Sequence, residues 1–356
     1  MSGGAEVHLE EMLRRVAAAG HRVTLFCSNY QDGAPEEIIE GLRIIRAGNR
    51  YNFNLIARGH IKRLIRAEKY DLFIEDINKI PFYSPLYQDL PTIVIVPHLF
   101  STAVFQEINF VLGTYIFLAE LPIRRVYEGK RFCVISESTA GDMVKRGIPP
   151  HNVTVIHCGI DASLYNNNRG YKKYDQPTVL YLGRIKKYKS VQHLISAFQL
   201  VKKDLPEAHL AIVGSGDYLD QLRSQAHHLD LDGAVEFPGF VPQDKKVEYL
   251  CRSHVMVYPS LKEGWGLTNI EANSCGTPAI AANTPGLRDS VKSGQSGLLY
   301  EYGNITQLAD SIKRLLTDAE ERQRLEQGGL KWAAQFNWDI AAGKFLDLCL
   351  EVAGRP

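Results

Sequence analysis

The stretch "TVLYLGRIKKYK", residues 178–189, joins a short apolar strand to a glycine and a run of cations. β-Branched and aromatic residues favour a strand at 178–182, and Gly183 allows a tight turn at its carboxyl end. Similar apolar runs alternate with longer helical patterns along nearly the whole chain. This alternation predicts parallel sheets flanked by helices.

The other predicted strands are separated by helical segments. In residues 6–19, for example, apolar residues recur at helical spacing until Gly20 ends the helix. The remaining strands are expected at residues 22–26, 43–46, 71–74, 92–96, 132–135, 153–156, 209–213, 235–237, 255–257, 278–281 and 297–300.

A polar stretch, "YNNNRGYKKYDQP" at residues 165–177, interrupts this alternation. Asparagines, a glycine and a proline in so short a segment are typical of a linker. At 356 residues the chain also exceeds the usual size of one domain. We therefore predict an α/β protein with two Rossmann-like, doubly wound domains at residues 1–165 and 178–337, joined by a linker at 166–177.

The composition of the chain indicates which binding partners and which cellular setting to expect. The formal net charge is +1, with 45% hydrophobic and 23% charged residues, which gives no reason to expect nucleic acid as a partner. Six scattered cysteines form no CxxC pair, and this favours a reduced, cytoplasmic setting. The opening residues lack the pattern of a signal peptide.

The longest apolar run is "FVLGTYIFLA" at residues 110–119, about half the roughly 20 residues that a spanning helix needs. Basic residues follow it between 124 and 131. A buried or half-buried helix is the favoured interpretation. The alternative is an interfacial helix, through which residues 108–131 would contact anionic lipid on the inner face of the membrane.

Two glutamates frame the glycine-rich stretch "EGWGLTNIE", residues 263–271. Thr268 and Glu271 fit a capping box at a helix start, a local explanation that leaves Glu263 without a role. The glycines between them let the backbone approach a bound molecule, and amides at the start of the next helix point at anions. Carboxylates suit sugar hydroxyls, because they accept hydrogen bonds from adjacent donors.

Arg184 and Lys189 follow the strand at 178–182 at its carboxyl end, where open α/β sheets bind ligands. Arginine offers a two-pronged donor to phosphate oxygens, and lysine adds a mobile charge. Taken alone, these residues would be interpreted as a solvated basic turn. Together with the glutamate pair, they suit a nucleotide diphosphate sugar, with ribose at one carboxylate and hexose at the other.

Two further strand ends carry turn-like motifs. "VGSGD" at 213–217 could bring the backbone at Gly214 and Gly216 close to a ligand. In "VEFPGFVP", Phe240, next to Val241, could hold a flat base. Each motif is equally well explained as an ordinary turn between elements.

The order of these motifs resembles that of retaining glycosyltransferases of family 4, which have the B-type fold. "GGAE" (3–6) is similar to the family's glycine loop, "PH" (97–98) to its cleft histidine, and "CGID" (158–161) to its asparagine-glycine-hydrophobic-aspartate segment. "FNWDIAAGKFLDLCLE" resembles the closing helix, which implies that residues 338–356 cross back onto the first domain. The likeness covers nearly the whole chain.

The resemblance implies roles for particular residues. Arg184 and Lys189 would neutralise the departing diphosphate, and Glu263 would hold the transferred sugar. His98, which alone could be a satisfied core histidine, would lie beside that sugar, and Glu271 would bind the ribose. The other donor-binding residues that it implies are Gly3, Gly4, Gly183, Gly214, Gly216, Phe240, Val241, Gly264, Trp265, Gly266 and Leu267.

The sequence departs from the family's pattern at three places. The glycine loop lies at residues 3 and 4, so the strand that precedes it in the family is missing and the first sheet is expected to lack a central strand. Cys158 replaces the usual asparagine and Ser190 a common glycine. We expect both replacements to be tolerated.

The predicted function is a retaining, metal-independent transfer of a hexose from a UDP or GDP sugar to a glycan, lipid-linked or small-molecule acceptor. No cofactor is expected, and "DLD" at 230–232 is interpreted as a solvated loop, not as a metal site. Two alternatives stay open. A glycosidase would use Glu263 and Glu271 as acid and nucleophile. A sugar-nucleotide-binding protein, inactivated by the missing strand, would bind nucleoside diphosphate without transfer.

Overall fold

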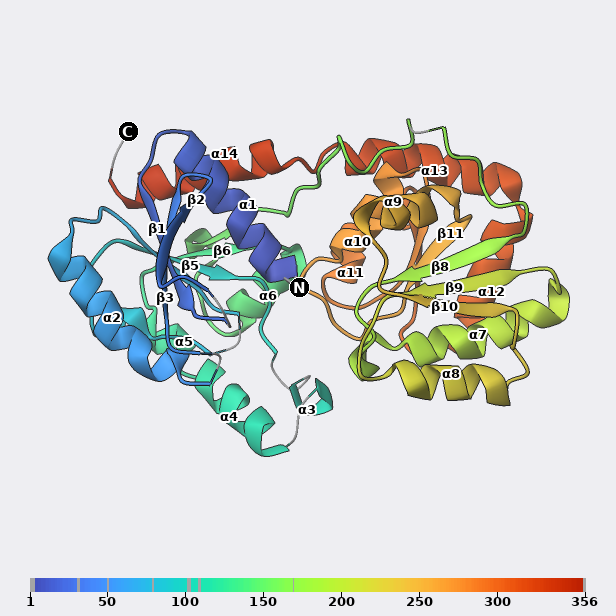
Figure 1. Ribbon diagram of the computed structural model, residues 1–356, viewed down its shortest axis with the longest axis horizontal. Helices are drawn as coiled ribbons and strands as arrows, with labels where there is room; N and C mark the ends of the chain where they lie inside the picture. Colours follow the sequence, from blue (N-terminus) through green and yellow to red (C-terminus); the bar gives the residue numbers. More distant parts are fainter. Residues whose placement is uncertain are drawn as a thin grey trace. The chain divides into compact units, whose positions relative to one another are not determined.

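The computed structural model describes residues 4–30, 33–49, 51–78, 80–100, 104–107, 110–168 and 170–354. The chain divides into two compact units (Figure 1). Unit 1 consists of Met1–Gly159 and Trp338–Pro356, and unit 2 of Ile160–Asn337. Packing thus places the boundary at residue 159, whereas the sequence analysis drew it at residue 165.

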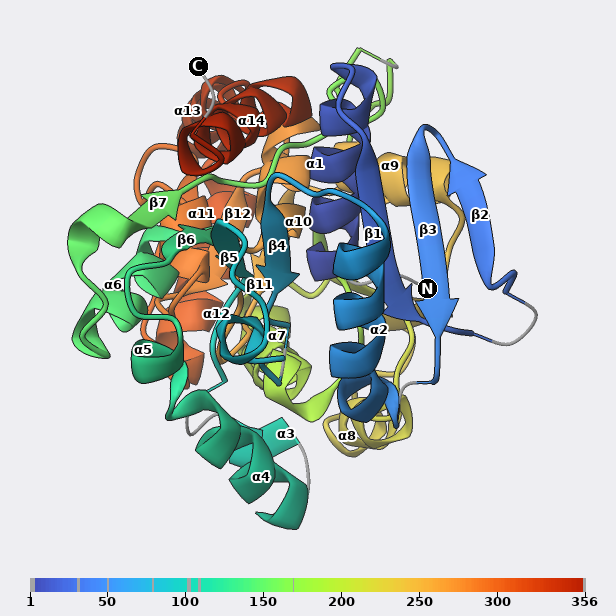
Figure 2. The same cartoon turned by 90° about the vertical axis from the view of Figure 1, so that its left-hand side faces the viewer.

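Unit 1 contains two separate sheets among the described residues, with strand orders β1-β3-β2 and β4-β5-β6-β7 (Figure 2). Every pairing is parallel except that of β2 with β3. The break lies between β1 and β4, in the sheet that was predicted to lack a central strand. The strands are β1 (Val23–Ser28), β2 (Glu36–Ile39), β3 (Leu42–Ala47), β4 (Phe73–Asp76), β5 (Thr92–Val96), β6 (Arg131–Val134) and β7 (Val153–Val155).

The helices of unit 1 include the predicted opening helix, α1. Its residues Met12, Leu13 and Val16 are buried, as their spacing requires, and α1 packs on α14, the last helix of the chain. The helices are α1 (Gly4–Ala18), α2 (Phe53–Ala67), α3 (Val104–Glu107), α4 (Phe110–Glu120), α5 (Ile123–Val126), α6 (Glu137–Lys145) and α14 (Trp338–Val352), with 3-10 turns at Ser84–Leu86 and Pro150–Asn152.

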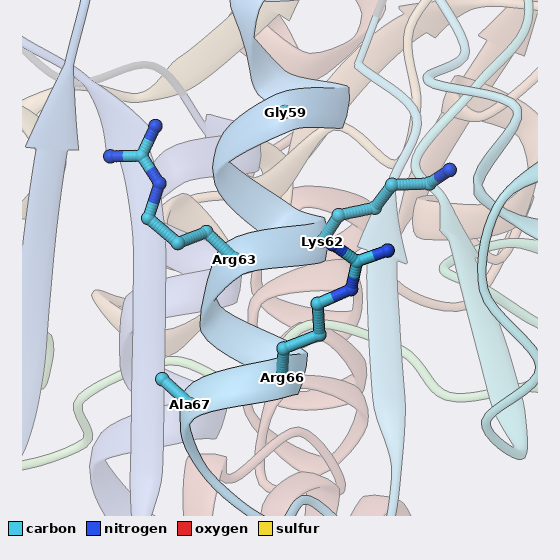
Figure 3. Close-up of a pocket in the computed structure, with 5 residues that line it drawn as sticks. All are labelled: Gly59, Lys62, Arg63, Arg66 and Ala67. Carbon is cyan, nitrogen blue, oxygen red and sulfur yellow. The ribbon is translucent and has the colours of Figure 1, made fainter.

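A cationic depression of about 540 Å³ lies on the outer face of α2. It is lined by Gly59 and Ala67 and by Lys62, Arg63 and Arg66, whose side chains extend from the helix (Figure 3). None of these residues was predicted to bind a ligand. Because α2 contains no acidic residue, its charge is not balanced within the helix.

The α4 helix is half-buried, as the favoured interpretation allowed, and it has an exposed apolar face. Phe110 and Val111 are 76% and 79% exposed, and Leu118 is 54% exposed. Only Gly113, Ile116 and Glu120 are buried. Within the described residues, every helix is too short or too polar to cross a bilayer.

Unit 2 is built on one parallel sheet of six strands in the order β10-β9-β8-β11-β12-β13. Every residue of β8 is buried, because helices cover both faces of the sheet and its strands are apolar throughout (Figure 1). The strands are β8 (Thr178–Leu182), β9 (His209–Val213), β10 (Val235–Gly239), β11 (Val255–Tyr258), β12 (Ala279–Ala282) and β13 (Gly297–Tyr300).

The helices of unit 2 alternate with these strands, as the sequence predicted. They are α7 (Val191–Asp204), α8 (Leu219–His228), α9 (Gln243–Arg252), α10 (Leu267–Ser274), α11 (Leu287–Ser290), α12 (Ile305–Thr317) and α13 (Ala319–Ala333), with a 3-10 turn at Lys187–Lys189. Each predicted strand of the chain overlaps an observed one. The short antiparallel strand β2 was missed.

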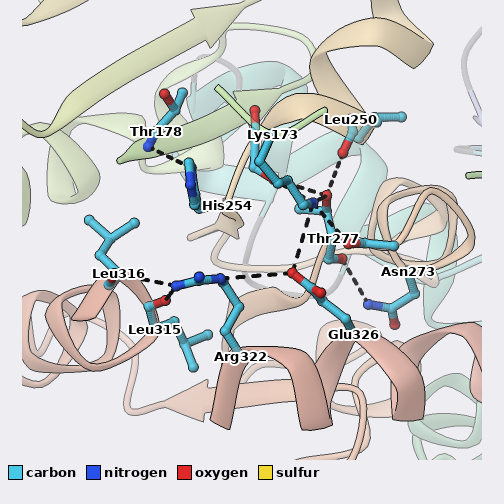
Figure 4. Close-up of polar contacts among 12 residues, drawn as sticks. Lys173, Thr178, Leu250, His254, Asn273, Thr277, Leu315, Leu316, Arg322 and Glu326 are labelled. Carbon is cyan, nitrogen blue, oxygen red and sulfur yellow. Dashed lines mark hydrogen bonds and ion pairs between the residues drawn. The ribbon is translucent and has the colours of Figure 1, made fainter. Parts of the chain in front are cut away.

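The polar stretch predicted as a linker is bound to unit 2 through Lys173 (Figure 4). The Lys173 ammonium donates to the carbonyls of Ser253 and Gly276, at 2.8 and 2.9 Å, and to Thr277 Oγ1 at 2.8 Å. Ser253 and Gly276 follow the ends of α9 and α10, where carbonyls lack partners within the helix. One cation therefore ties the segment to the ends of two helices.

Candidate active site

The predicted cations and glutamates of unit 2 lie at the carboxyl ends of neighbouring strands. Lys189 belongs to the 3-10 turn after β8, and Glu263 lies in the loop after β11, the strand that pairs with β8. The Lys189 ammonium donates to Glu263 Oε1 at 2.5 Å and to Tyr258 Oη at 3.3 Å. A residue predicted to hold phosphate and one predicted to hold sugar are thus bonded to each other.

This ion pair is buried. The Lys189 side chain is 5% exposed and the Glu263 side chain 14%. Burial by itself lowers the pKa of Lys189, but the Glu263 carboxylate more than compensates and raises the pKa well above its usual value. A lysine ammonium has three donors, and two are used here, so one is left for a ligand.

Arg184 differs from Lys189 in its exposure. Its side chain is exposed, while its backbone carbonyl accepts a hydrogen bond from Tyr181 Oη at 2.8 Å. The guanidinium therefore follows the strand end without being part of the buried pair. Gly183, just before it, is half-buried and donates its amide to the Val213 carbonyl.

Glu271 lies on α10 and is bonded to Lys246 of α9, at 2.9 Å. The capping box predicted for Thr268 and Glu271 is not formed, so that interpretation is wrong. Gly266 is the N-cap of α10, in the left-handed conformation, and no side chain caps the helix there. Because the helix begins before Thr268, the Glu271 side chain points to a neighbouring helix and not back along its own first turn.

The loop that carries Glu263 is held by the segment before α11. The Glu263 amide donates to the Pro285 carbonyl at 3.2 Å. A Cβ on Gly286 would lie 2.2 Å from the Glu263 carbonyl oxygen, so only glycine fits there. Trp265 is buried and meets Phe336 edge-on, with ring centroids 5.3 Å apart. Gly264 is half-buried, and Leu267 is the first residue of α10.

Gly214 and Gly216 have a structural role that the sequence analysis did not anticipate. A Cβ on Gly214 would lie 1.9 Å from the Gly183 carbonyl oxygen, and one on Gly216 1.8 Å from that of Ile185. The two loops after β8 and β9 therefore touch through their backbones. The Gly214 amide donates to the Gly239 carbonyl at 2.8 Å, so it is already used within the fold.

The remaining predicted residues are dispersed. Phe240 follows β10 and is 64% exposed, while Val241 packs against the core of unit 2. In unit 1, His98 lies two residues after β5, half-buried, with its ring 4.7 Å from that of Phe100. Gly4 is the exposed first residue of α1, and Gly3 lies outside the described residues.

One local prediction, the solvated loop at residues 230–232, is confirmed. The "DLD" stretch is a surface turn, in which Asp230 and Asp232 are exposed and Asp232 bonds to His227. The described residues contain no group of three histidine, cysteine or acidic side chains arranged to hold a metal.

Sequence and structure comparisons place this architecture among B-type glycosyltransferase folds. The structure superposes on a sucrose-phosphate synthase of Thermosynechococcus elongatus with a TM-score of 0.79 at 21% identity, covering 98% of this chain and 93% of that one. It also superposes on the HepE protein of Anabaena, solved with UDP and glucose, with a TM-score of 0.76 at 19% identity over 97% and 95% of the two chains.

The chain belongs to glycosyltransferase family 4. Residues 2–164 match the model described as Glycosyltransferase Family 4, and residues 166–332 match that of glycosyl transferases group 1. A GDP-mannose-dependent alpha-(1-6)-phosphatidylinositol monomannoside mannosyltransferase of Mycobacterium tuberculosis is 30% identical over 65% of this chain. A D-inositol 3-phosphate glycosyltransferase of Thermobispora bispora is 29% identical over 58% of it. The matches span 64% and 52% of these two relatives.

Sequence reasoning missed Lys246, Tyr165 and Gly286. Lys246 lies in "QDKKVEY", which has the ordinary pattern of an exposed helix start. Only the pairing of α9 with α10 brings it to Glu271. The turn "NTPG" around Gly286 could have been recognised as a loop, but its contact with the Glu263 loop has no signal in the sequence.

Proposed function

We propose that this chain transfers a hexose, with retention and without a metal, from a nucleotide diphosphate sugar to a glycan, lipid-linked or small-molecule acceptor. The observation that carries the proposal is the pairing of each predicted glutamate with a lysine, Lys189 buried and Lys246 half-buried. Two named relatives are glycosyltransferases, one of them GDP-mannose-dependent, and the HepE structure holds UDP and glucose. UDP and GDP are therefore the nucleotides to test.

The donor would lie across the loop from Glu263 to Leu267. The N-terminal amides of α10 face an anion favourably, because the first amides of a helix have no partner within it. Lys189 would use its remaining donor, and Arg184 its exposed guanidinium, to neutralise the charge that grows on the leaving diphosphate. Stabilisation of that charge is the main catalytic contribution, and it needs no metal in this scheme.

Each glutamate would hold sugar hydroxyls and not attack the anomeric carbon. Glu263 would orient the hexose, with its carboxylate fixed by Lys189, and Glu271 would bind the ribose. Retention would follow from attack on the face that the diphosphate leaves, with the diphosphate accepting the proton of the acceptor. The glycosidase alternative is less favoured, because it needs one carboxyl as a proton donor, whereas both carboxylates accept bonds from ammonium groups.

We also propose that α4 lies against an anionic lipid surface while the acceptor is used. Its exposed apolar side chains include Phe110 and Val111, and Arg124 and Arg125 of α5 are exposed directly after it. Apolar insertion combined with cations is the usual basis of peripheral binding. The protein named after a phosphatidylinositol substrate is one example of a relative with a lipid acceptor.

The test is a thermal-shift screen of UDP, GDP and their sugars, followed by an assay of transfer. We expect one nucleotide to raise the melting temperature, and its sugar to be transferred with the anomeric configuration kept, as read by NMR. Transfer should persist in EDTA. Hydrolysis of an aryl glycoside without nucleotide would favour the glycosidase, and tight nucleotide binding without transfer would favour the binding protein.

A prediction for Glu271 belongs to this test. Glu271→Ala would leave Lys246 buried without its counter-charge and would destabilise the fold, so the isosteric Glu271→Gln is the cleaner change. We expect the Gln variant to bind nucleoside diphosphate about ten-fold more weakly, because one charged acceptor of a ribose hydroxyl is lost. Its affinity for inorganic pyrophosphate, which has no ribose, should be unchanged. Equal loss for both ligands in isothermal titration would contradict the ribose role.

A further inference from the structure

Lys246 is a half-buried cation of unit 2 to which neither the sequence nor the proposed function gives a role. Its ammonium donates to Glu271 Oε1 at 2.9 Å, lies 2.9 Å from Oε2, and donates to Tyr165 Oη at 2.6 Å. A lysine has three donors, and two of them make the hydrogen bonds to Oε1 and to Tyr165 Oη. The lysine is therefore held in place by contacts within its own unit.

The pair is shielded from solvent. The Glu271 side chain is 7% exposed and that of Lys246 is 21% exposed. Burial lowers the pKa of Lys246, but Glu271 and Tyr165 more than reverse this, so its pKa lies above the usual value. Burial and then Glu271 raise the pKa of Tyr165 to about 12. The charge on the lysine and the proton on the phenol are therefore fixed across the physiological pH range.

A buried ion pair of this kind contributes little to stability by itself, since the loss of hydration offsets the attraction. Its effect is on geometry. A carboxylate has about four acceptor positions, two on each oxygen. Lys246 uses one acceptor position on Oε1 and lies 2.9 Å from Oε2, so it fixes the rotation of the Glu271 carboxylate. The acceptor positions that Lys246 does not use remain for the hydroxyls of a ribose.

Tyr165 fixes the lysine in turn. Its ring lies under the ammonium, at 4.8 Å from the ring centroid, and its hydroxyl also accepts from Gln243 Nε2 at 2.6 Å. Its backbone carbonyl accepts from Ser274 Oγ at 2.7 Å. The tyrosine is therefore held by α9 and by the end of α10, and it closes the side of the lysine that Glu271 does not cover.

We propose that Lys246, supported by Tyr165, is a positioning residue that orients the Glu271 carboxylate to accept both hydroxyls of a nucleotide ribose. The proposal rests on the proposed function, in which Glu271 binds ribose. Lys246 itself does not touch the ligand. It fixes the rotation of the carboxylate that accepts the hydroxyls, so it contributes to the discrimination between ribose and deoxyribose.

The experiment compares a nucleoside diphosphate with its 2′-deoxy analogue on wild type and on Lys246→Met. The nucleotide is UDP or GDP, whichever stabilises the wild type. Methionine keeps the length of the side chain but removes the charge and the donors. We expect wild type to prefer the ribonucleotide by about ten-fold, and the variant to reduce that preference to about two-fold. Under turnover, KM for the donor should rise far more than kcat falls.

Lys245→Met is the matched control, because it is the same change one position away. Lys245 is 62% exposed and pairs with Glu248, on the other side of the helix from Glu271. We expect this control to keep the wild-type preference. Tyr165→Phe, which loses only the hydroxyl, is the milder variant if Lys246→Met does not fold, and we expect it to show a smaller reduction of the same kind.

The outcomes separate the two hypotheses. If wild type binds both nucleotides equally, Glu271 does not distinguish ribose from deoxyribose. The proposed role of Glu271 then fails together with the inference. If wild type prefers the ribonucleotide and Lys246→Met weakens both nucleotides equally, Lys246 has only a structural role. That result, or an unchanged preference in both Lys246→Met and Tyr165→Phe, overturns the inference and leaves the proposed function standing.

Discussion

Ser190 shows how one residue departs from its family and what the departure costs. It has a φ of 55°, the left-handed conformation that disfavours every residue with a Cβ. The glycine common at this position in the family would adopt it freely. Ser190 is nevertheless buried, and its hydroxyl bonds to Tyr302 Oη at 2.9 Å, which compensates part of the strain. Cys158, the other replacement, is simply buried.

The balance between this strain and this hydrogen bond predicts which of two variants is the more stable. Ser190→Ala loses the hydrogen bond and keeps the strain, whereas Ser190→Gly loses the bond and the strain together. We expect the glycine variant to be the more stable by about 1 kcal/mol in urea unfolding, because the left-handed conformation costs a residue with a Cβ roughly that amount. An alanine variant as stable as the glycine variant would show that the backbone is not strained there.

Helix α4 has an exposed apolar face that packing within the fold does not explain. Its exposed apolar residues predict binding to vesicles. We expect the pair Phe110→Ser and Val111→Ser to reduce co-sedimentation with phosphatidylglycerol vesicles by at least about ten-fold, since each removes apolar area that would enter the lipid. Binding should weaken in high salt, because cations contribute.

The control for α4 is an equally exposed apolar residue elsewhere in unit 1. Ile38, on the edge strand β2, is 75% exposed. Ile38→Ser should leave vesicle binding unchanged. If neutral and anionic vesicles bind the protein equally, the cations of α5 do not contribute to the binding. If the wild type does not bind vesicles at all, α4 must be covered by something other than lipid.

The contact between α1 and α14 predicts a pH dependence. His8 of α1 is 1% exposed and packs against Trp338, with ring centroids 6.1 Å apart. Burial lowers the pKa of His8 to about 4, from 6.5 in the unfolded chain. As pH falls from about 6.5 to about 4, the unfolded chain takes up a proton that the folded chain refuses, so stability falls in this window, by about 3 kcal/mol at most.

His8→Leu removes the titration and keeps an apolar contact with Trp338. We expect the stability of α1 and α14, measured by amide hydrogen exchange, to fall less between pH 7 and pH 5 in this variant than in wild type. Asp76 acts in the opposite direction, because burial raises its pKa to about 7. Its contribution to the stability of the fold is therefore lost as pH rises from about 4 to 7. The comparison with His8→Leu isolates the histidine, since Asp76 is present in both proteins.

At the scale of the whole molecule, the two units differ in how well their sheets are protected. All six residues of β1 are half-buried, and β1 pairs with β3 alone among the described strands. In unit 2, β8 is wholly buried between β9 and β11. We expect the amides of β1 and β3 to exchange faster than those of β8 and β9 under native conditions, as measured by mass spectrometry. Equal protection would mean that β1 is paired on its free side in solution.

Local patterns were enough to predict most of the elements and to select the candidate residues of the site. Apolar runs and helical spacing depend on which side of one element is buried, so they are present in a short window of sequence. The candidate binding residues could be recognised in the same way, because they follow predicted strands. They are Glu263, Glu271, Arg184 and Lys189. The polar edge strand β2, with the sequence "EEII", had no such pattern and was missed. The exposed face of α4 agrees with the half-buried helix that its apolar run predicted.

The partners of these residues came from the order of strands and the packing of helices. Lys189 meets Glu263 because β8 and β11 are neighbours, although they are far apart in sequence. Lys246 meets Glu271 because α9 packs on α10. The sequence alone established which charges are present and at which ends of which elements. Which carboxylate pairs with which lysine depends on distances between side chains across the fold. No local sequence pattern gives these distances.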